Sequence, residues 1–550
     1  MKPSILALAL SCFVGIAATP SRAADAPVSD AAIAQRLEAR LSGDRTGACV
    51  LAAVIDHAQV RRARVCAGTR EDGPPDWDAA LEIGSVTKTM TAYLVQDLVE
   101  RGRWSLDDPI ARFLPAGTVV PRQGERQILV RDLLTHSAAM PALPPGMQVT
   151  NPTDPYAGLT EQALLDALAH TTLAWPIGSR AEYSNFGMMV LSLAVARSEG
   201  GSLEAALRER LFKPLAMKAW IADGGGGQAA PGHLPLGTRT PAWTITPNLG
   251  GVGMVKASLA DMTRYARAAL GDGPADVVAR LRATQQPLAN GYAMNWMRRT
   301  LHGHDVVMHE GGTGGFSSLV ALDPSAHRGV VLLADTALTD LGGLGDIGLA
   351  LLGLDVPVQP PRRATPAPAS LVRALVGDWQ LGALPLRLWQ ADDGKLMAQA
   401  AGQGAFELRH DSAGDFYPTV VDALLTPLPA ASADAPLQAF AWRQGGGLVE
   451  AHRAVAASSA SSAAAGHPAW RDWVGEYAIT TQFSLNVLEQ GGRLMIRGTG
   501  QPAIEATSTG HDRLEVSQVG AVVEFERDAA GKVVAAVLRQ GGQVLRGARR

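Results

Sequence analysis

The feature that most constrains the fold is a proline-rich break that begins at Val356. Proline-rich sequences of this kind form semi-rigid linkers. Long helical patterns precede the break, and short alternating segments interrupted by glycine follow it. A chain of 550 residues is also too long for one ordinary core. We therefore predict a large domain over residues 28–355, a linker over 356–370, and small β-structures beyond it.

The part after the break contains an internal repeat. Val376–Trp379 recurs as Val474–Tyr477, each at the start of a series of short alternating strands. The repeat predicts two small antiparallel all-β modules, which we expect to be barrels: module 1 over 371–455 and module 2 over 468–550. A Ser/Ala-rich linker over 456–467 separates them. Neither copy concentrates nucleophiles or metal ligands, which favours a structural or substrate-gating role over chemistry.

The N-terminus has the pattern of a secretory signal peptide. Lys2 precedes an apolar stretch from Ile5 to Ala18, and small residues then lead to Ala23. We expect residues 1–23 to be removed and the mature chain to be periplasmic or secreted. No later run of 18 apolar residues occurs, so we expect no transmembrane segment after signal removal.

Two cysteines remain after the predicted cleavage site. Cys49 and Cys66 flank an expected hairpin, and a two-residue loop at His57-Ala58 would place them opposite each other. An exported protein can keep such a disulfide. A shift of one residue in register would instead leave two small core side chains, and the sequence does not decide between these alternatives.

The large domain reads as α+β. Strands are expected over 47–68 at its start and over 306–308, 318–323 and 329–334 at its end, with helices between them. This order predicts a sheet that joins the two ends of the domain.

A serine and a lysine occupy the start of one of these helices. Ser85 and Lys88 are three residues apart, so on a helix their side chains share a face. A serine hydroxyl becomes a good nucleophile when a neighbouring base takes its proton, and a desolvated lysine can do this. The helix N-terminus also supplies backbone N–H groups that suit a developing oxyanion.

Other functional classes find little support. The formal charge of −3 gives no electrostatic reason to expect nucleic acid. The glycines of Gly343–Gly348 match a dinucleotide-binding pattern but do not directly follow a strand. His302 and His304 lack the second ligand group that a metal site needs. We expect no cofactor and no metal.

Three motifs together carry a family resemblance. Ser85-x-x-Lys88, Tyr183-x-Asn185 and His309-Glu310-Gly311 stand in the order and rough spacing of the motifs of serine β-lactamases and penicillin-binding proteins. Over roughly residues 30–350, the chain most resembles the class C β-lactamase-like branch, which includes DD-peptidases, esterases and D-aminopeptidases. The repeated modules resemble those appended to D-aminopeptidase-like members.

The resemblance implies a role for each residue. Ser85 would be the nucleophile, and Tyr183 would act as general base if a cation such as Lys88 favours its phenolate. Asn185 would orient Lys88 or the substrate. The backbone N–H groups of Ser85 and Gly312 would form the oxyanion hole.

The third motif departs from that of many relatives. His309 replaces a lysine and makes the positive charge titratable. Glu310 stands where relatives that bind a carboxylate usually carry a hydroxyl, and an acid there should repel a carboxylate-bearing substrate. This departure favours esterase or aminopeptidase activity over β-lactamase activity.

The sequence thus predicts a serine hydrolase that acts through a Ser85 acyl-enzyme on an ester or peptide/amide substrate. The expected partner is a small-molecule or peptide substrate, with the cell wall as one candidate source. The alternative activity is that of a class C-type β-lactamase or D-Ala-D-Ala carboxypeptidase. A non-catalytic cell-wall-binding protein is disfavoured because Ser85, Lys88 and Tyr183 are all intact.

Overall fold

The computed structural model describes most of the chain from residue 29 onward. The described residues are 29–147, 149, 151, 153–222, 229–382, 384–401, 403–418, 420–421, 423–428, 437–444, 447–454, 469–479, 484–490, 493–499, 503–510, 512–516, 521–528, 530–540 and 543–550. The predicted signal peptide and the Ser/Ala-rich linker over 456–467 lie outside them.

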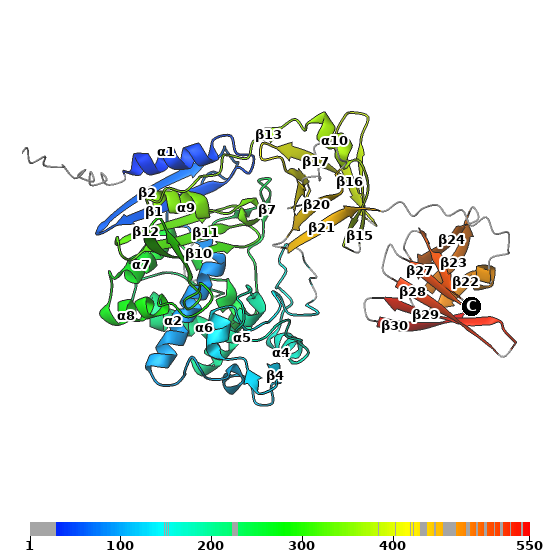
Figure 1. Ribbon diagram of the computed structural model, residues 1–550, viewed down its shortest axis with the longest axis horizontal. Coiled ribbons are helices and arrows are strands. Elements are labelled where there is room, and N and C mark those ends of the chain that lie inside the picture. The colour runs from blue at the N-terminus through cyan, green and yellow to red at the C-terminus, as the bar shows by residue number, and fades with distance from the viewer. Residues whose placement is uncertain are drawn as a thin grey trace, which may run out of the picture.

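The large domain is built on a six-stranded antiparallel sheet in the order β2-β1-β12-β11-β10-β9 (Figure 1). Val50 pairs with Ala334, so strands from the two ends of the domain lie side by side, which confirms the α+β prediction. The strands are β1 (Cys49–Asp56), β2 (Gln59–Cys66), β9 (Met297–Leu301), β10 (His304–Gly312), β11 (Ser317–Asp323) and β12 (Arg328–Ala334).

Helices cover both faces of this sheet (Figure 1). Because side chains alternate along a strand, Leu51, Ala53 and Ile55 join the core that contains α2, whereas Val50 and Ala52 face α1 and α9. The helices are α1 (Asp30–Leu41), α2 (Thr87–Glu100), α3 (Val130–Leu134), α4 (Glu161–Ala169), α5 (Asn185–Ser198), α6 (Leu203–Leu207), α7 (Leu259–Leu270), α8 (Ala275–Thr284) and α9 (Gly345–Leu351).

Short elements complete the domain. They are β3 (Leu81–Glu82), η1 (Gly84–Val86), η2 (Ile110–Phe113), β4 (Arg122–Gln123), β5 (Arg126–Gln127), η3 (Arg208–Phe212), β6 (Gly232–His233), β7 (Arg239–Thr240), η4 (Pro247–Val252), β8 (Lys256–Ala257) and η5 (Thr339–Leu341). Local sequence explains several helix starts: the Thr160 hydroxyl accepts the Ala163 N–H at 3.1 Å and so caps α4. None of the described helices combines the length and hydropathy needed to cross a membrane.

Module 1 is a closed barrel. Strands β14 to β21 form a ring, since β14 pairs with β21 and β17 pairs with both β16 and β18. The predicted linker contributes β13 to the edge of β17. The elements are β13 (Ala364–Thr365), α10 (Ala369–Leu375), β14 (Gly377–Leu381), β15 (Leu384–Gln390), β16 (Leu396–Ala400), β17 (Phe406–Asp411), β18 (Phe416–Pro418), β19 (Ala423–Pro427), β20 (Ala439–Gln444) and β21 (Gly447–Arg453).

Module 2 is also all-β and has its own core around Trp473 and Tyr477. Its strand order is β25-β24-β23-β22-β30-β29-β28-β27-β26. The elements are η6 (Ala469–Trp473), β22 (Gly475–Ala478), β23 (Ser484–Gln490), β24 (Arg493–Gly498), β25 (Ile504–Glu505), β26 (Thr507–Gly510), β27 (Arg513–Val516), β28 (Ala521–Arg527), β29 (Val533–Gln540) and β30 (Gln543–Arg549).

The hairpin of β1 and β2 has the register that a two-residue loop implies. Asp56 pairs with Gln59 and Cys49 pairs with Cys66. The two cysteines form a disulfide, which settles the alternative that the sequence left open.

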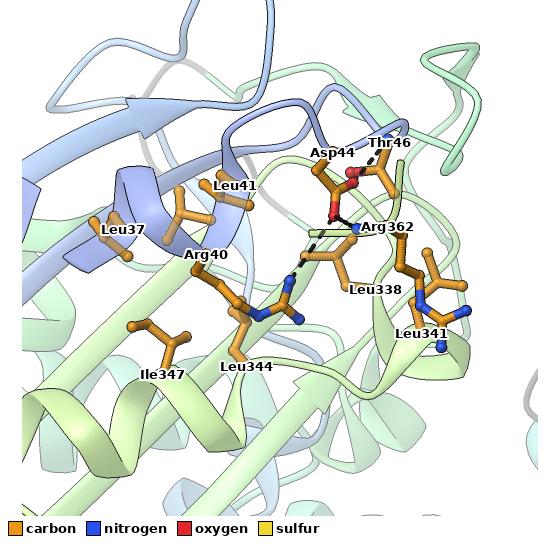
Figure 2. A pocket seen from close by; sticks show the side chains of 11 residues that line it. Leu37, Arg40, Leu41, Asp44, Thr46, Leu338, Leu341, Leu344, Ile347 and Arg362 are labelled. Atoms are coloured by element: carbon orange, nitrogen blue, oxygen red, sulfur yellow. Dashed lines mark hydrogen bonds and ion pairs between the residues drawn. The ribbon is translucent and has the colours of Figure 1, made fainter. Parts of the chain in front are cut away.

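Helix α1 packs against the face of the sheet opposite α2. An apolar cluster lies between them, and polar contacts surround this cluster (Figure 2). Arg40 Nε donates to Asp346 at 3.1 Å, and Asp44 accepts the backbone N–H of Arg362 at 2.9 Å. Leu37, Leu41 and their neighbours line a cavity of only about 10 Å³ there. The chain that leads to module 1 is therefore held against α1.

Buried ion pairs join module 1 to the large domain. The Asp411 carboxylate in β17 accepts from Arg45 Nε at 3.0 Å and lies 3.3 Å from Arg362, and the Asp411 side chain is fully buried. The Arg45 guanidinium also lies 3.6 Å from the centre of the Tyr417 ring. Tyr417 and Leu424 of the barrel share an apolar cluster with α1 and β12. The barrel and the large domain thus share buried surface.

We expect Asp411→Ala to destabilise this junction. The substitution leaves Arg45 buried without its carboxylate, and breaking a buried pair typically costs about 3 to 5 kcal/mol. Calorimetric unfolding of the full chain should show a lower midpoint for the transition that includes the barrel. Asp393→Ala, which removes an exposed partner of Lys395 in the same module, is the matched control and should leave the midpoint in place. An unchanged midpoint for Asp411→Ala would contradict this account.

Candidate active site

Ser85 and Lys88 meet at the start of α2, as the sequence predicts. Ser85 lies in the η1 turn, and Lys88 Nζ is hydrogen-bonded to Ser85 Oγ at 2.8 Å. Nζ also donates to the Val252 carbonyl oxygen at 2.6 Å. Lys88 is completely buried, and burial lowers the pKa of its amine well below the usual range. A neutral amine in this position can accept the proton of the Ser85 hydroxyl.

Tyr183 approaches the same pair of residues. Lys88 Nζ lies 4.8 Å from the centre of the Tyr183 ring, and the Tyr183 hydroxyl is hydrogen-bonded to Ser85. Burial raises the pKa of the Tyr183 phenol, an effect that solvent moderates because 36% of the residue is exposed. The expected lysine cation that would favour a phenolate is itself disfavoured by burial. Tyr183 is therefore a neutral phenol in the free protein, so the condition on which its predicted role as general base depended is not met.

Asn185 opens α5 two residues after Tyr183. Its Oδ1 is buried and has no hydrogen-bond partner among the described residues. The Tyr156 hydroxyl is hydrogen-bonded to Asn185, and burial raises the pKa of Tyr156 to about 12. Asn185 thus has a free acceptor, and its side chain is held by a tyrosine that the sequence analysis did not identify.

His309 faces the Ser85 side of the sheet. Its ring centre lies 6.3 Å from that of Tyr183, and the residue is only 2% exposed. Nδ1 donates to the Glu310 carbonyl oxygen at 2.6 Å, which leaves Nε2 as a buried acceptor with no partner among the described residues. Burial, with a smaller contribution from Lys88, lowers the pKa of His309 to about 3. The ring is therefore uncharged at neutral pH.

Glu310 points to the opposite face, so its predicted contact with substrate is wrong. Neighbouring residues of a strand project to opposite sides, and His309 already occupies the Ser85 side. A Cβ added at Gly343 or Gly345, beside α9, would overlap the Glu310 carboxylate. The backbone of Leu344 is hydrogen-bonded to this carboxylate, whose pKa is raised by burial. The predicted repulsion of carboxylate substrates by Glu310 therefore has no structural basis.

The end of β10 packs directly against the Ser85 turn. A Cβ at Gly84 would overlap the backbone of Gly312, and a Cβ at Gly311 would overlap the carbonyl oxygen of Ile83. Gly84 also has φ +48°, a conformation that glycine adopts readily. Ser318 Oγ donates to the same Ile83 carbonyl at 2.7 Å. The backbones at Ser85 and Gly312 are thus neighbours, as an oxyanion hole requires.

Two further aromatic side chains belong to this cluster. The His136 ring lies 4.4 Å from the Tyr183 ring and 5.3 Å from the Tyr292 ring. His136 follows the end of α3, and the sequence analysis assigned its side chain no role. Tyr292 lies in a loop and follows no recognisable pattern. Among the described residues, no group of three His, Cys, Asp or Glu side chains is arranged to bind a metal.

The buried His309 gives a prediction for stability against pH. An unfolded chain binds a proton at His309 below about pH 6.5, whereas the folded chain resists protonation until about pH 3. The unfolded state therefore binds more protons in this window, and the free energy of unfolding falls as pH falls. One such group contributes up to about 1.4 kcal/mol per pH unit.

Denaturant unfolding between pH 6.5 and pH 4 should show a smaller pH slope for His309→Gln than for the native chain. His170→Gln, which changes an exposed histidine, should retain the native slope. Equal slopes for the native chain and His309→Gln would refute the burial of a neutral ring.

Comparisons with known proteins agree with this architecture. The profile of the family described as Beta-lactamase matches residues 31–353. The D-alanyl-D-alanine-carboxypeptidase/endopeptidase AmpH of Escherichia coli K12 is 29% identical over 223 residues, which cover 40% of this chain and 57% of the length of AmpH. The chain thus spans only part of that relative.

A second relative and a solved structure are also similar to this chain. Penicillin-binding protein 4 of Amycolatopsis lactamdurans is 28% identical over 326 residues, covering 53% of this chain and 83% of that protein. A solved β-lactamase/D-alanine carboxypeptidase from Pseudomonas syringae has a TM-score of 0.50 at 20% identity, covering 60% of this chain and 98% of its own, and shows the shared fold. The family profile covers more than half of the 550 residues, and the chain belongs to the beta-lactamase family.

Proposed function

We propose that the chain is a serine hydrolase that forms an acyl-enzyme at Ser85 with an ester or amide substrate. The observation that carries the proposal is the completely buried Lys88 amine, 2.8 Å from Ser85 Oγ. Because burial lowers the pKa of Lys88, the neutral amine that can act as a base is favoured relative to the ammonium.

In the proposed acylation, Lys88 Nζ takes the Ser85 hydroxyl proton as Oγ bonds to the substrate carbonyl carbon. The carbonyl oxygen becomes an oxyanion that the backbone N–H groups of Ser85 and Gly312 stabilise. The bond to the leaving group then breaks, and the Tyr183 hydroxyl gives that group its proton and regains one from Lys88. Water then attacks the acyl carbonyl carbon and gives a proton to Tyr183, which passes its own proton to Lys88. Lys88 returns a proton to Ser85 Oγ as the acyl bond breaks, and the acid product leaves.

The protonation states around Ser85 favour an uncharged ester or amide at the reacting centre. Burial lowers the pKa values of Lys88, His136 and His309, and raises those of Tyr156 and Tyr183. Each shift favours the neutral form. The described groups around Ser85 thus offer little charge to bind a substrate carboxylate or a substrate amine.

A class C-type β-lactamase or D-Ala-D-Ala carboxypeptidase activity is the second candidate. The placement of Glu310 beside α9 favours it, because no acid of the third motif then faces Ser85. The relatives named as a carboxypeptidase/endopeptidase and a penicillin-binding protein are consistent with it. The substrate would be a β-lactam for the first of these activities and a cell-wall peptide for the second.

We also propose that the protein acts in the periplasm or outside the cell. The Cys49–Cys66 disulfide supports this location, since disulfides persist mainly in oxidising compartments. The signal-peptide pattern of residues 1–23 is consistent with export.

Labelling with a fluorophosphonate tests the nucleophile. Intact-mass measurement should show one adduct on the native chain and none on Ser85→Ala. Lys88→Met keeps the size of the buried side chain but removes the base, and should slow labelling at least about 100-fold. Ser105→Ala changes an exposed serine and should label at the native rate. Persistence of the adduct on Ser85→Ala would refute the proposal.

Glu310→Gln tests whether the Glu310 side chain acts on the substrate. Glutamate and glutamine have the same shape, and the side chain at residue 310 faces α9, so the substitution should leave substrate preference unchanged. The measurement is the ratio of kcat/KM for a penicillin-type substrate to kcat/KM for a neutral ester. A selective gain for the carboxylate-bearing substrate would show that Glu310 does act at the site.

A further inference from the structure

His136 occupies an unusual backbone conformation beside Ser85. It follows the end of α3, is 3% exposed, and has φ +54°. A non-glycine residue in the left-handed region costs about 1 kcal/mol or more and persists where the surroundings require it. The strain indicates that contacts with the surrounding residues hold His136 in this conformation.

Several contacts of His136 are with the segment that carries Tyr183. The His136 carbonyl oxygen accepts the Glu182 N–H at 2.8 Å, and His136 Nδ1 accepts the Ser184 N–H at 3.3 Å. These donors belong to the residues on either side of Tyr183. The His136 ring itself lies 4.4 Å from the Tyr183 ring at an interplanar angle of 35°. One residue thus fixes the backbone on both sides of Tyr183 and one face of its ring.

The hydrogen bond from Ser184 also determines the tautomer of His136. Because Nδ1 accepts a backbone N–H, a neutral ring carries its proton on Nε2. Nε2 is buried and has no hydrogen-bond partner among the described residues. Burial and the nearby Lys88 and His309 lower the pKa of His136 well below its usual range, which keeps Nδ1 available as an acceptor.

We infer that His136 is a positioning residue for Tyr183: it holds the phenol at hydrogen-bonding distance from Ser85. This inference rests on the proposed function of Ser85 and Tyr183. It assigns a role to a side chain that does not itself exchange protons with the substrate. A displacement of about 1 Å at a reacting group can cost about 100-fold in rate, so loss of this clamp should be visible in the kinetics.

The experiment measures the rate of Ser85 acylation by a neutral ester in four full-length proteins: native, His136→Ala, Tyr183→Phe and the double variant. We expect His136→Ala to slow acylation by about 10- to 100-fold with little change in KM. In the Tyr183→Phe background, the same substitution should have almost no further effect, because the group that it positions is gone. Equal factors in the two backgrounds would overturn the inference.

A pair of conservative variants separates positioning from folding. Asparagine accepts the left-handed conformation and places an oxygen near the position of Nδ1, whereas glutamine places its oxygen near that of Nε2. His136→Asn should therefore recover more activity than His136→Gln. If His136→Ala does not fold, this comparison decides, and equal activity of the two amides would count against the inference.

His302→Ala is the matched backbone control. His302 also has a left-handed conformation, with φ +49°, but lies in the exposed turn between β9 and β10. The His302→Ala substitution should leave the rate of Ser85 acylation unchanged. Fluorophosphonate labelling of the native chain is measured in parallel: absence of a Ser85 adduct would refute the proposed function, whereas a normal adduct with additive effects would refute only the role of His136.

Discussion

The site depends on direct contact between two backbone segments. The end of β10 and the turn before α2 approach so closely that a Cβ at Gly84 would overlap the Gly312 backbone and a Cβ at Gly311 would overlap the Ile83 carbonyl oxygen. Ser318 supports the contact from β11 by donating to the Ile83 carbonyl. The sheet therefore positions the turn that carries Ser85 through main-chain packing, which tolerates less displacement than contacts between flexible side chains.

Desolvation then determines the chemistry. Lys88 has a serine hydroxyl and a backbone carbonyl oxygen as hydrogen-bond partners, and burial is the cause of its lowered pKa. A charged amine in this environment would be costly, so the neutral base is stabilised relative to the ammonium. The same effect keeps His309 uncharged. The helical core around α2 thus contributes to reactivity by excluding water.

Much of this fold was predictable because it depends on periodic patterns. Strands at both ends of the large domain and the Thr160 cap follow from local sequence, whereas the Cys49–Cys66 register was one of two alternatives that the sequence left open. The predicted role of Glu310 failed because a motif was read as a unit, although adjacent strand residues must face opposite sides. His136, Tyr156 and Tyr292 could not be placed, since their proximity to Tyr183 and Asn185 depends on loops that bring distant segments together. The protonation states required the burial that only the structure gives.

The pairing of β1 with β12 also constrains the order in which the chain can fold. Val50 finds its partner in Ala334, at the far end of the domain, so the central pairing closes a very long loop. A chain synthesised from its N-terminus must hold the β1–β2 hairpin and the Ser85 helix without most of their sheet until β10, β11 and β12 have emerged. Such high contact order slows folding and leaves strand edges exposed in the meantime. The sheet that positions the turn carrying Ser85 can therefore be completed only after β10, β11 and β12 are available to pair.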